Sequence, residues 1–164
     1  MAIKRFLKHL ITTRGAAERA FPPATMDAIE HAIREVESRH RGEIRFVVEG
    51  ALDMGPLWQQ QSPRERALEV FALQRVWDTP DNNGILLYVL MADHAVEIVC
   101  DRGIHSRVGD GTWQAVCHDI ESAFRQGRYK DGVIAGITAL GATLERHYPG
   151  AARANELSDR PQIL

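Results

Sequence analysis

Two polar segments, residues 78–84 and 101–111, hold most of the side chains in this sequence that could do chemistry. They flank two apolar runs that are separated by a short polar break at residues 93–94, an order typical of a β-hairpin. Because the open ends of a hairpin meet at one end of its sheet, we expect the two polar segments to lie together, with Ile85 roughly opposite Asp101. The side chains gathered there would be those of Asp78, Asp81, Asn82, Asn83, Asp101, Arg102, His105, Arg107 and Asp110.

Two kinds of chemistry suit this group of side chains. Carboxylate and amide oxygens are the hard ligands that calcium and magnesium take, so the sequence predicts a divalent-metal site. Its expected ligands are Asp81, Asn83, Asp101 and Asp110. Arginines beside glycines and a helix N-terminus, expected near Thr112, suit a phosphate or a carboxylate.

Together these features would suit metal-assisted phosphoester hydrolysis. The residues to which we assign catalytic roles are Asp101, Arg102 and His105. The alternative is purely structural: the aspartates and asparagines shape turns and cap helices, and the Arg–Asp pairs are surface ion pairs. The spacing of these residues is not a diagnostic metal signature, so both interpretations stay open at this point.

Composition limits the remaining classes of function. The chain has 164 residues, of which 45% are hydrophobic and 26% charged, as in an ordinary globular domain. A formal charge of −2 and a pI near 6.4 argue against a nucleic-acid-binding protein. Two cysteines, Cys100 and Cys117, are too few for a disulfide scaffold and are expected to be free core thiols. No organic cofactor is expected, because neither a P-loop nor a dinucleotide-binding glycine motif occurs.

The order of predicted elements is helix, strand, helix, strand, strand, helix, helix. The expected strands are residues 43–49, Ile85–Met91 and 95–101, with the second of them central in the sheet because it is apolar on both faces. The first two strands are joined by a helix, which begins at the capping sequence Ser62-Pro63-Arg64-Glu65, so they should be parallel. The predicted fold is therefore a three-layer α/β/α sandwich around a small mixed sheet, with a β-hairpin and a parallel βαβ unit.

Three regions are expected along the chain. Residues 1–21 form a basic amphipathic N-terminal helix, residues 24–148 the α/β/α domain and residues 149–164 a loose tail. The longest uninterrupted apolar run has eight residues, too few to span a membrane, and the N-terminus lacks the continuous apolar stretch of a signal peptide. We therefore expect a cytoplasmic protein, peripheral to the inner membrane at most.

The first twenty residues carry a charge of +4, from Lys4, Arg5, Lys8, Arg14 and Arg19 against Glu18. The apolar residues Phe6, Leu7, Leu10 and Ile11 would share one helical face. If that face packs on the domain, the helix is ordinary; if it is free, the helix can lie on an anionic membrane. We expect at most weak binding to anionic vesicles, abolished by moderate salt or by deleting residues 1–20. A non-catalytic interaction module at the inner membrane face, or one with an unknown protein partner, is the alternative function.

Four segments in order resemble the TPM domain family, which includes thylakoid-lumen acid phosphatases, photosystem repair factors and many bacterial proteins. The resemblance covers roughly residues 24–148. Its segments are Asp81-Asn82-Asn83-Gly84-Ile85-Leu86-Leu87, Val96-Glu97-Ile98-Val99, Arg102-Gly103-Ile104 and Ala123-Phe124-Arg125-x-Gly127-x-Tyr129-x-x-Gly132. It implies an α/β/α sandwich, in agreement with the order of elements.

The resemblance also implies a site. Some members of the family bind calcium at this end of the sheet, and some hydrolyse phosphate esters. The family's turn before the central strand corresponds to Asp81, Asn82 and Asn83. In the loop after the hairpin, this sequence has His105 and Ser106 where the family usually has glutamate and glycine, which removes one acidic ligand. The chain resembles a shorter, cytoplasmic branch of the family.

Overall fold

A mixed four-stranded sheet organises the molecule. The computed structural model describes residues 2–151 and 154–164. The strands are β1 (Glu43–Glu49), β2 (Gly84–Leu90), β3 (Ala95–Cys100) and β4 (Gln162–Ile163), and they lie in the order β3-β2-β1-β4. β1 runs parallel to β2 and to β4, whereas β2 and β3 form an antiparallel hairpin. The parallel pair, the hairpin and the interior position of β2 are as the sequence predicts.

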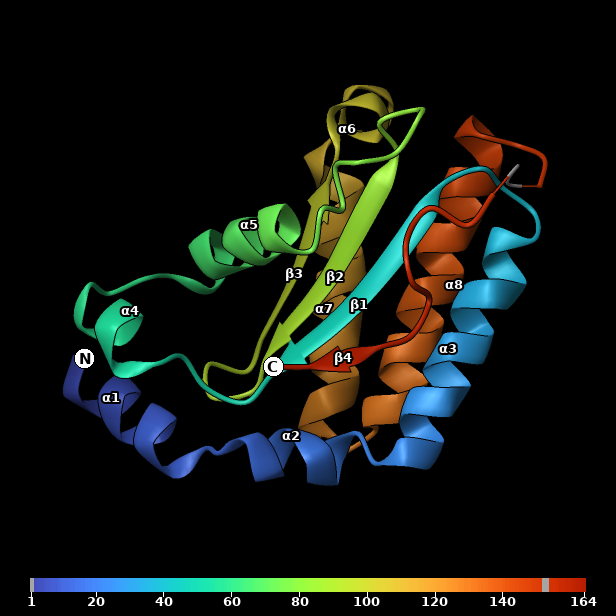
Figure 1. Cartoon of the computed structure of the whole chain (residues 1–164). Coiled ribbons are helices and arrows are strands. Elements are labelled where there is room, and N and C mark those ends of the chain that lie inside the picture. The colour runs from blue at the N-terminus through green and yellow to red at the C-terminus, as the bar shows by residue number, and fades with distance from the viewer. Residues whose placement is uncertain (1, 152–153) are drawn as a thin grey trace.

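Helices cover both faces of this sheet (Figure 1). α3, α7 and α8 pack on one face and α5 lies on the other, so the predicted α/β/α sandwich is confirmed. The helices are α1 (Ala2–Ile11), α2 (Arg14–Ala20), α3 (Pro23–Glu37), α4 (Met54–Trp58), α5 (Pro63–Leu73), α6 (Arg102–Val108), α7 (Asp110–Arg125) and α8 (Tyr129–His147). α5 begins with the predicted capping box, in which the Glu65 N–H donates to the Ser62 hydroxyl and the Ser62 N–H donates to the Glu65 carboxylate.

Alternate residues of the strands enter two separate cores. Ile44 and Phe46 of β1, with Ile85 and Leu87 of β2, face the layer of α3, α7 and α8. Val47, Leu86 and Tyr88 face α5 and the C-terminal segment. Because both faces are covered, β2 is buried along its whole length, as expected for an interior strand.

The second polar segment is mostly helical. Residues 101–111 were expected to form a loop, but residues 102–108 form α6, because the Asp101 side chain caps the helix and accepts the Arg102 N–H at 2.7 Å. The hairpin register is also one residue away from the expected one. Ile85 faces Cys100, and the Asp101 N–H donates to the carbonyl oxygen of Gly84 at 2.9 Å.

The two ends of the chain also differ from expectation. The N-terminal helix is two helices, α1 and α2, separated at Thr12 and Thr13. The expectation of a loose C-terminal tail is wrong: residues 162–163 pair with β1 as β4, and Asp159 is buried. This segment gave no sequence signal because its strand has only two residues, whose pairing depends on an already formed β1.

Candidate functional site

The two polar segments meet at the end of the sheet where β2 begins and β3 ends. The Gly103 N–H donates to the carbonyl oxygen of Asn82 at 2.9 Å. A Cβ atom on Gly103 would lie 2.5 Å from that oxygen and 2.6 Å from the carbonyl oxygen of Asp81, so only glycine allows this approach. The turn before β2 and the first turn of α6 therefore form one surface.

Asp101 is the most constrained side chain on this surface. It is 7% exposed, and its Oδ1 caps the N-terminus of α6 by accepting the Arg102 N–H. Its Oδ2 is buried and has no hydrogen-bond partner among the described residues. A buried carboxylate oxygen without a partner is costly, and in native proteins it points to a bound water or ion. We call this carboxylate and its neighbours Asp81 and Asn83 the Asp101 site.

Arg41, in the turn before β1, connects the other two members of the site. The Asn83 side chain is 1% exposed and its Nδ2 donates to the carbonyl oxygen of Arg41 at 3.1 Å. The Asp81 carboxylate is more exposed and lies 3.7 Å from Arg41 Nη1. This loose ion pair leaves the Asp81 carboxylate free to turn toward a ligand beside Asp101.

Tyr148, which the sequence analysis did not single out, closes the same end of the sheet. Its hydroxyl is buried without a partner among the described residues, and its ring lies under the Arg107 guanidinium at 4.4 Å. Burial raises the pKa of Tyr148, and the negative charges of Asp81 and Asp101 add to that effect. A tyrosine directly after a helix has no spacing that marks it, so the sequence could not show this position.

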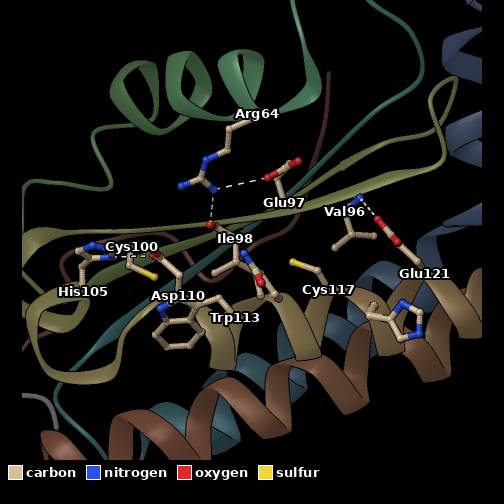
Figure 2. Close-up of a pocket in the computed structure, with 12 residues that line it drawn as sticks. Arg64, Val96, Glu97, Ile98, Cys100, His105, Asp110, Trp113, Cys117 and Glu121 are labelled. Carbon is tan, nitrogen blue, oxygen red and sulfur yellow. Dashed lines mark hydrogen bonds and ion pairs between the residues drawn. The ribbon is translucent and has the colours of Figure 1, made fainter.

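His105 and Asp110 face a different part of the surface. His105 Nδ1 lies 3.6 Å from Asp110 Oδ1, and both residues line a pocket of about 510 Å³ along β3 (Figure 2). The carboxylates of Asp81, Asp101 and Asp110 do not come within 4.8 Å of one another as a group anywhere in the described chain. Arg102 is exposed at the start of α6.

The pocket beside β3 covers the outer edge of the sheet. Arg64 of α5 donates to the carbonyl oxygen of Ile98 at 2.6 Å, and Glu121 of α7 accepts the Val96 N–H at 3.2 Å (Figure 2). Cys117 of α7 lines the same pocket beside this strand (Figure 2). Side chains thus occupy the backbone groups that a further strand would need, which is how native proteins protect an edge.

A second carboxyl cluster joins the end of α3, the start of β1 and the C-terminal segment. Glu37, Glu43 and Asp159, which we call the carboxyl triad, are buried, and an oxygen of each lies within 4.8 Å of the others, a spacing that could hold a metal ion. In the described residues no other three acidic, histidine or cysteine side chains meet this spacing. The triad has no signal in the sequence, because Asp159 belongs to the segment expected to be loose.

Every carboxylate of the triad already accepts a hydrogen bond. Glu37 accepts the Ile44 N–H at 2.7 Å, Glu43 accepts the N–H groups of residues 156 and 157, and Asp159 accepts Arg34 Nε at 3.3 Å. Burial, together with the nearby charges of Glu43 and Asp159, raises the pKa of Glu37 to about 9. Glu37 therefore carries a proton at neutral pH, and the triad fastens the C-terminal segment to α3 and β1.

Comparison with known proteins agrees with this architecture. A family model described as "TPM domain" matches residues 17–143. Among solved structures, the chain is similar to the BA42 protein from the psychrophilic bacterium Bizionia argentinensis, with 30% identity over 86% of this chain and 93% of that chain and a TM-score of 0.72. It also shares its fold with the N-terminal domain of a P. gingivalis protein, with 23% identity over 77% and 79% of the two chains and a TM-score of 0.60. The comparison with curated proteins finds no match.

The family match includes Asp81, Asn83 and Asp101 but not the whole molecule. α1 precedes it, and Tyr148 and Asp159 follow it.

Proposed function

Because this chain belongs to the TPM domain family, we propose that its Asp101 site binds a divalent cation of the calcium class and acts on phosphate esters. The observation that carries this proposal is the buried Oδ2 of Asp101, which has no partner among the described residues. A cation at this oxygen would satisfy it at the lowest cost, because carboxylate oxygens are preferred calcium ligands.

The residues around Asp101 fit such an ion. Asp81 supplies a second carboxylate that is held only by a loose ion pair, and Asn83 supplies a buried amide. Calcium takes carboxylate, amide, backbone carbonyl and water oxygens together, so this donor set suits it better than zinc, which prefers nitrogen and sulfur. Asp110 is not a ligand in this proposal, because its carboxylate lies beside His105 in the pocket along β3.

The carboxyl triad is the weaker candidate for the cation. Its oxygens already accept backbone and arginine donors, and a cation would have to displace the proton that Glu37 holds at neutral pH. A buried carboxyl group with a raised pKa that accepts the Ile44 N–H is explained by its structural role in anchoring residues 154–164.

Hydrolysis would use the arginines around the Asp101 site. A bound divalent cation supplies Lewis-acid chemistry and an activated water. Arg41 lies beside Asp81, and Arg102 is exposed at the start of α6 directly after Asp101. Guanidinium groups bind phosphoryl oxygens with paired hydrogen bonds, so both arginines would orient an anionic ester at the cation. His105 lies beside Asp110 in the pocket along β3, so it is assigned no part in this step.

The decisive variants are Asp101→Asn and Glu37→Gln. The first substitution keeps an oxygen for the helix cap but removes the negative charge, whereas the second keeps the acceptor for the Ile44 N–H and alters only the triad. We expect calorimetric titration with calcium to show binding that falls about tenfold or more in Asp101→Asn and is unchanged in Glu37→Gln. Calcium-dependent hydrolysis of p-nitrophenyl phosphate should follow the same order. Equal affinity in the native protein and both variants would contradict the proposed cation site.

A further inference from the structure

α1 packs on the domain through its polar side chains. Arg5 donates to the Asp93 carboxylate at 2.8 to 3.1 Å and to the carbonyl oxygen of Gln61 at 2.7 Å. His9 is 6% exposed, and its Nδ1 accepts the Leu52 N–H at 3.0 Å. A surface helix normally buries its apolar face, so this orientation is the reverse of the usual one.

The apolar residues of α1 consequently face outward. Ile3 is 75% exposed and Ile11 78%, and Leu7 and Leu10 are each 53% exposed. Of the four apolar residues whose packing the sequence left open, only Phe6 is half-buried. The apolar face of α1 is thus free, and its side chains remain available to contact a membrane or another molecule.

α4 extends this apolar surface. Trp58 is 74% exposed, and its ring lies 5.7 Å from that of Phe6. A groove of about 740 Å³ runs between α1 and α4 and is lined by residues that include Ile3, Leu7 and Trp58. We call this surface, formed by the outer side chains of α1 together with Trp58 of α4, the α1–α4 face.

We propose that the α1–α4 face binds the surface of an anionic lipid membrane. Lys4 and Lys8 are exposed beside the apolar residues, and α1 contains no acidic residue. Apolar side chains flanked by lysines, with a tryptophan nearby, match the boundary between acyl chains and negatively charged headgroups. No helix in the described part of the chain is long and apolar enough to cross a bilayer, so the contact is with the surface of the membrane.

This chemistry favours a membrane over a protein partner. The exposed residues of α1 are either apolar or basic, and its long lysine side chains can extend to headgroups while its leucines enter the acyl region. α1 also lies outside the part of the chain that matches the TPM domain, and neither α1 nor α4 contributes a residue to the Asp101 site. Binding should depend on both charge and apolar area.

Vesicle flotation with the full chain tests the proposal. We expect binding to phosphatidylcholine vesicles that contain phosphatidylglycerol and little binding to phosphatidylcholine alone. Lys4→Gln/Lys8→Gln should weaken binding about thirty-fold, which corresponds to about 1 kcal/mol for each lysine. Leu7→Asp/Ile11→Asp should remove it. Because the apolar side chains of α1 are exposed, added salt should weaken but not eliminate binding of the native chain, in contrast to the expectation from sequence that moderate salt abolishes it.

Leu73→Asp is the matched control, because Leu73 is 69% exposed at the end of α5 and does not line the groove between α1 and α4. Circular dichroism should show that every variant keeps its helical content. The proposal is overturned if anionic vesicles do not bind the chain, if Leu73→Asp loses binding as Leu7→Asp/Ile11→Asp does, or if light scattering shows that two copies of the chain bury this face against each other.

Discussion

Arg5 of α1 and Asp93 at the tip of the β2–β3 hairpin form a two-pronged ion pair, although 88 positions separate them in the chain. Burial alone would raise the pKa of Asp93, but the hydrogen bonds from Arg5, together with His9 Nε2 at 3.2 Å from Oδ1, outweigh it and hold that pKa below its ordinary value. This pair fixes which side of α1 meets the domain, and therefore which side faces outward.

Asp93→Asn should loosen α1 from the hairpin. The change removes a charge-assisted contact of a half-buried pair, so we expect the free energy of unfolding to fall by about 1.5–3 kcal/mol. Hydrogen exchange should show faster exchange in α1 with little change in β2. Because the folded-state pKa of Asp93 is lowered, this stabilisation is present above its ordinary value of 3.8 and is lost as pH falls below it. Asp27→Asn, on α3, is the control, and equal loss in both variants would contradict the role of the pair.

Glu37→Gln should change how stability depends on pH. The folded-state pKa of Glu37 is about 9 against 4.5 for the free side chain, so its contribution is full below about 4.5 and is lost as pH rises toward about 9. A glutamine cannot ionise, so the variant should gain stability relative to the native protein between pH 6 and 9. Urea unfolding at several pH values measures this. Glu35→Gln replaces an exposed residue of the same helix and should show no gain in stability with rising pH. An equal gain in the two variants would contradict the raised pKa of Glu37.

The sequence was sufficient for β1, β2, β3 and the long helices that cover them, because their signals are local. The capping box at Ser62, the fully apolar β2 and the polar break at residues 93–94 each depend on near neighbours, and all three appear in the structure. The meeting of residues 81–83 with residue 101 also followed, because hairpin pairing determines it.

What the sequence could not show depends on contacts between distant segments. The carboxyl triad joins α3, β1 and the C-terminal segment, and β4 exists only because β1 offers a free edge. The amphipathic pattern of α1 is visible in the sequence. The side of α1 that meets the domain depends on the ion pair with Asp93, a distant residue that the periodicity of α1 does not reveal. Asp110 was grouped with Asp101 because the two are close in sequence. In the structure α6 lies between them, and the Asp110 side chain lines the pocket along β3.

Arg64→Ala/Glu121→Ala should make the chain self-associate. The two changes release the carbonyl oxygen of Ile98 and the N–H of Val96, leaving the outer edge of β3 open to another strand. Size-exclusion chromatography should show oligomers that increase with concentration. Arg75→Ala/Asp119→Ala removes the same charges from exposed positions and should stay like the native protein; if both double variants behave alike, the edge is not what the two side chains protect.

The two thiols should react slowly while the protein is folded. Burial raises the pKa of both Cys100 and Cys117 to about 12, so little of the reactive thiolate exists at pH 8. We expect iodoacetamide to alkylate the folded protein about a hundred-fold more slowly than the protein unfolded in urea. Equal rates in the folded and unfolded protein would show that the two half-buried thiols are open to solvent and that their pKa values are not raised.

The most direct test of the Asp101 site is a calcium titration followed by the amide signals of a ¹⁵N-labelled chain. A cation at the unpartnered Oδ2 of Asp101 should move the signals of residues 81–84 and 101–103 in a saturable way, and these shifts should disappear in Asp101→Asn. Residues 37, 43 and 154–160, around the carboxyl triad, should not move. Saturable shifts confined to the triad, or no saturable shift at residues 81–84 and 101–103, would contradict the proposed site.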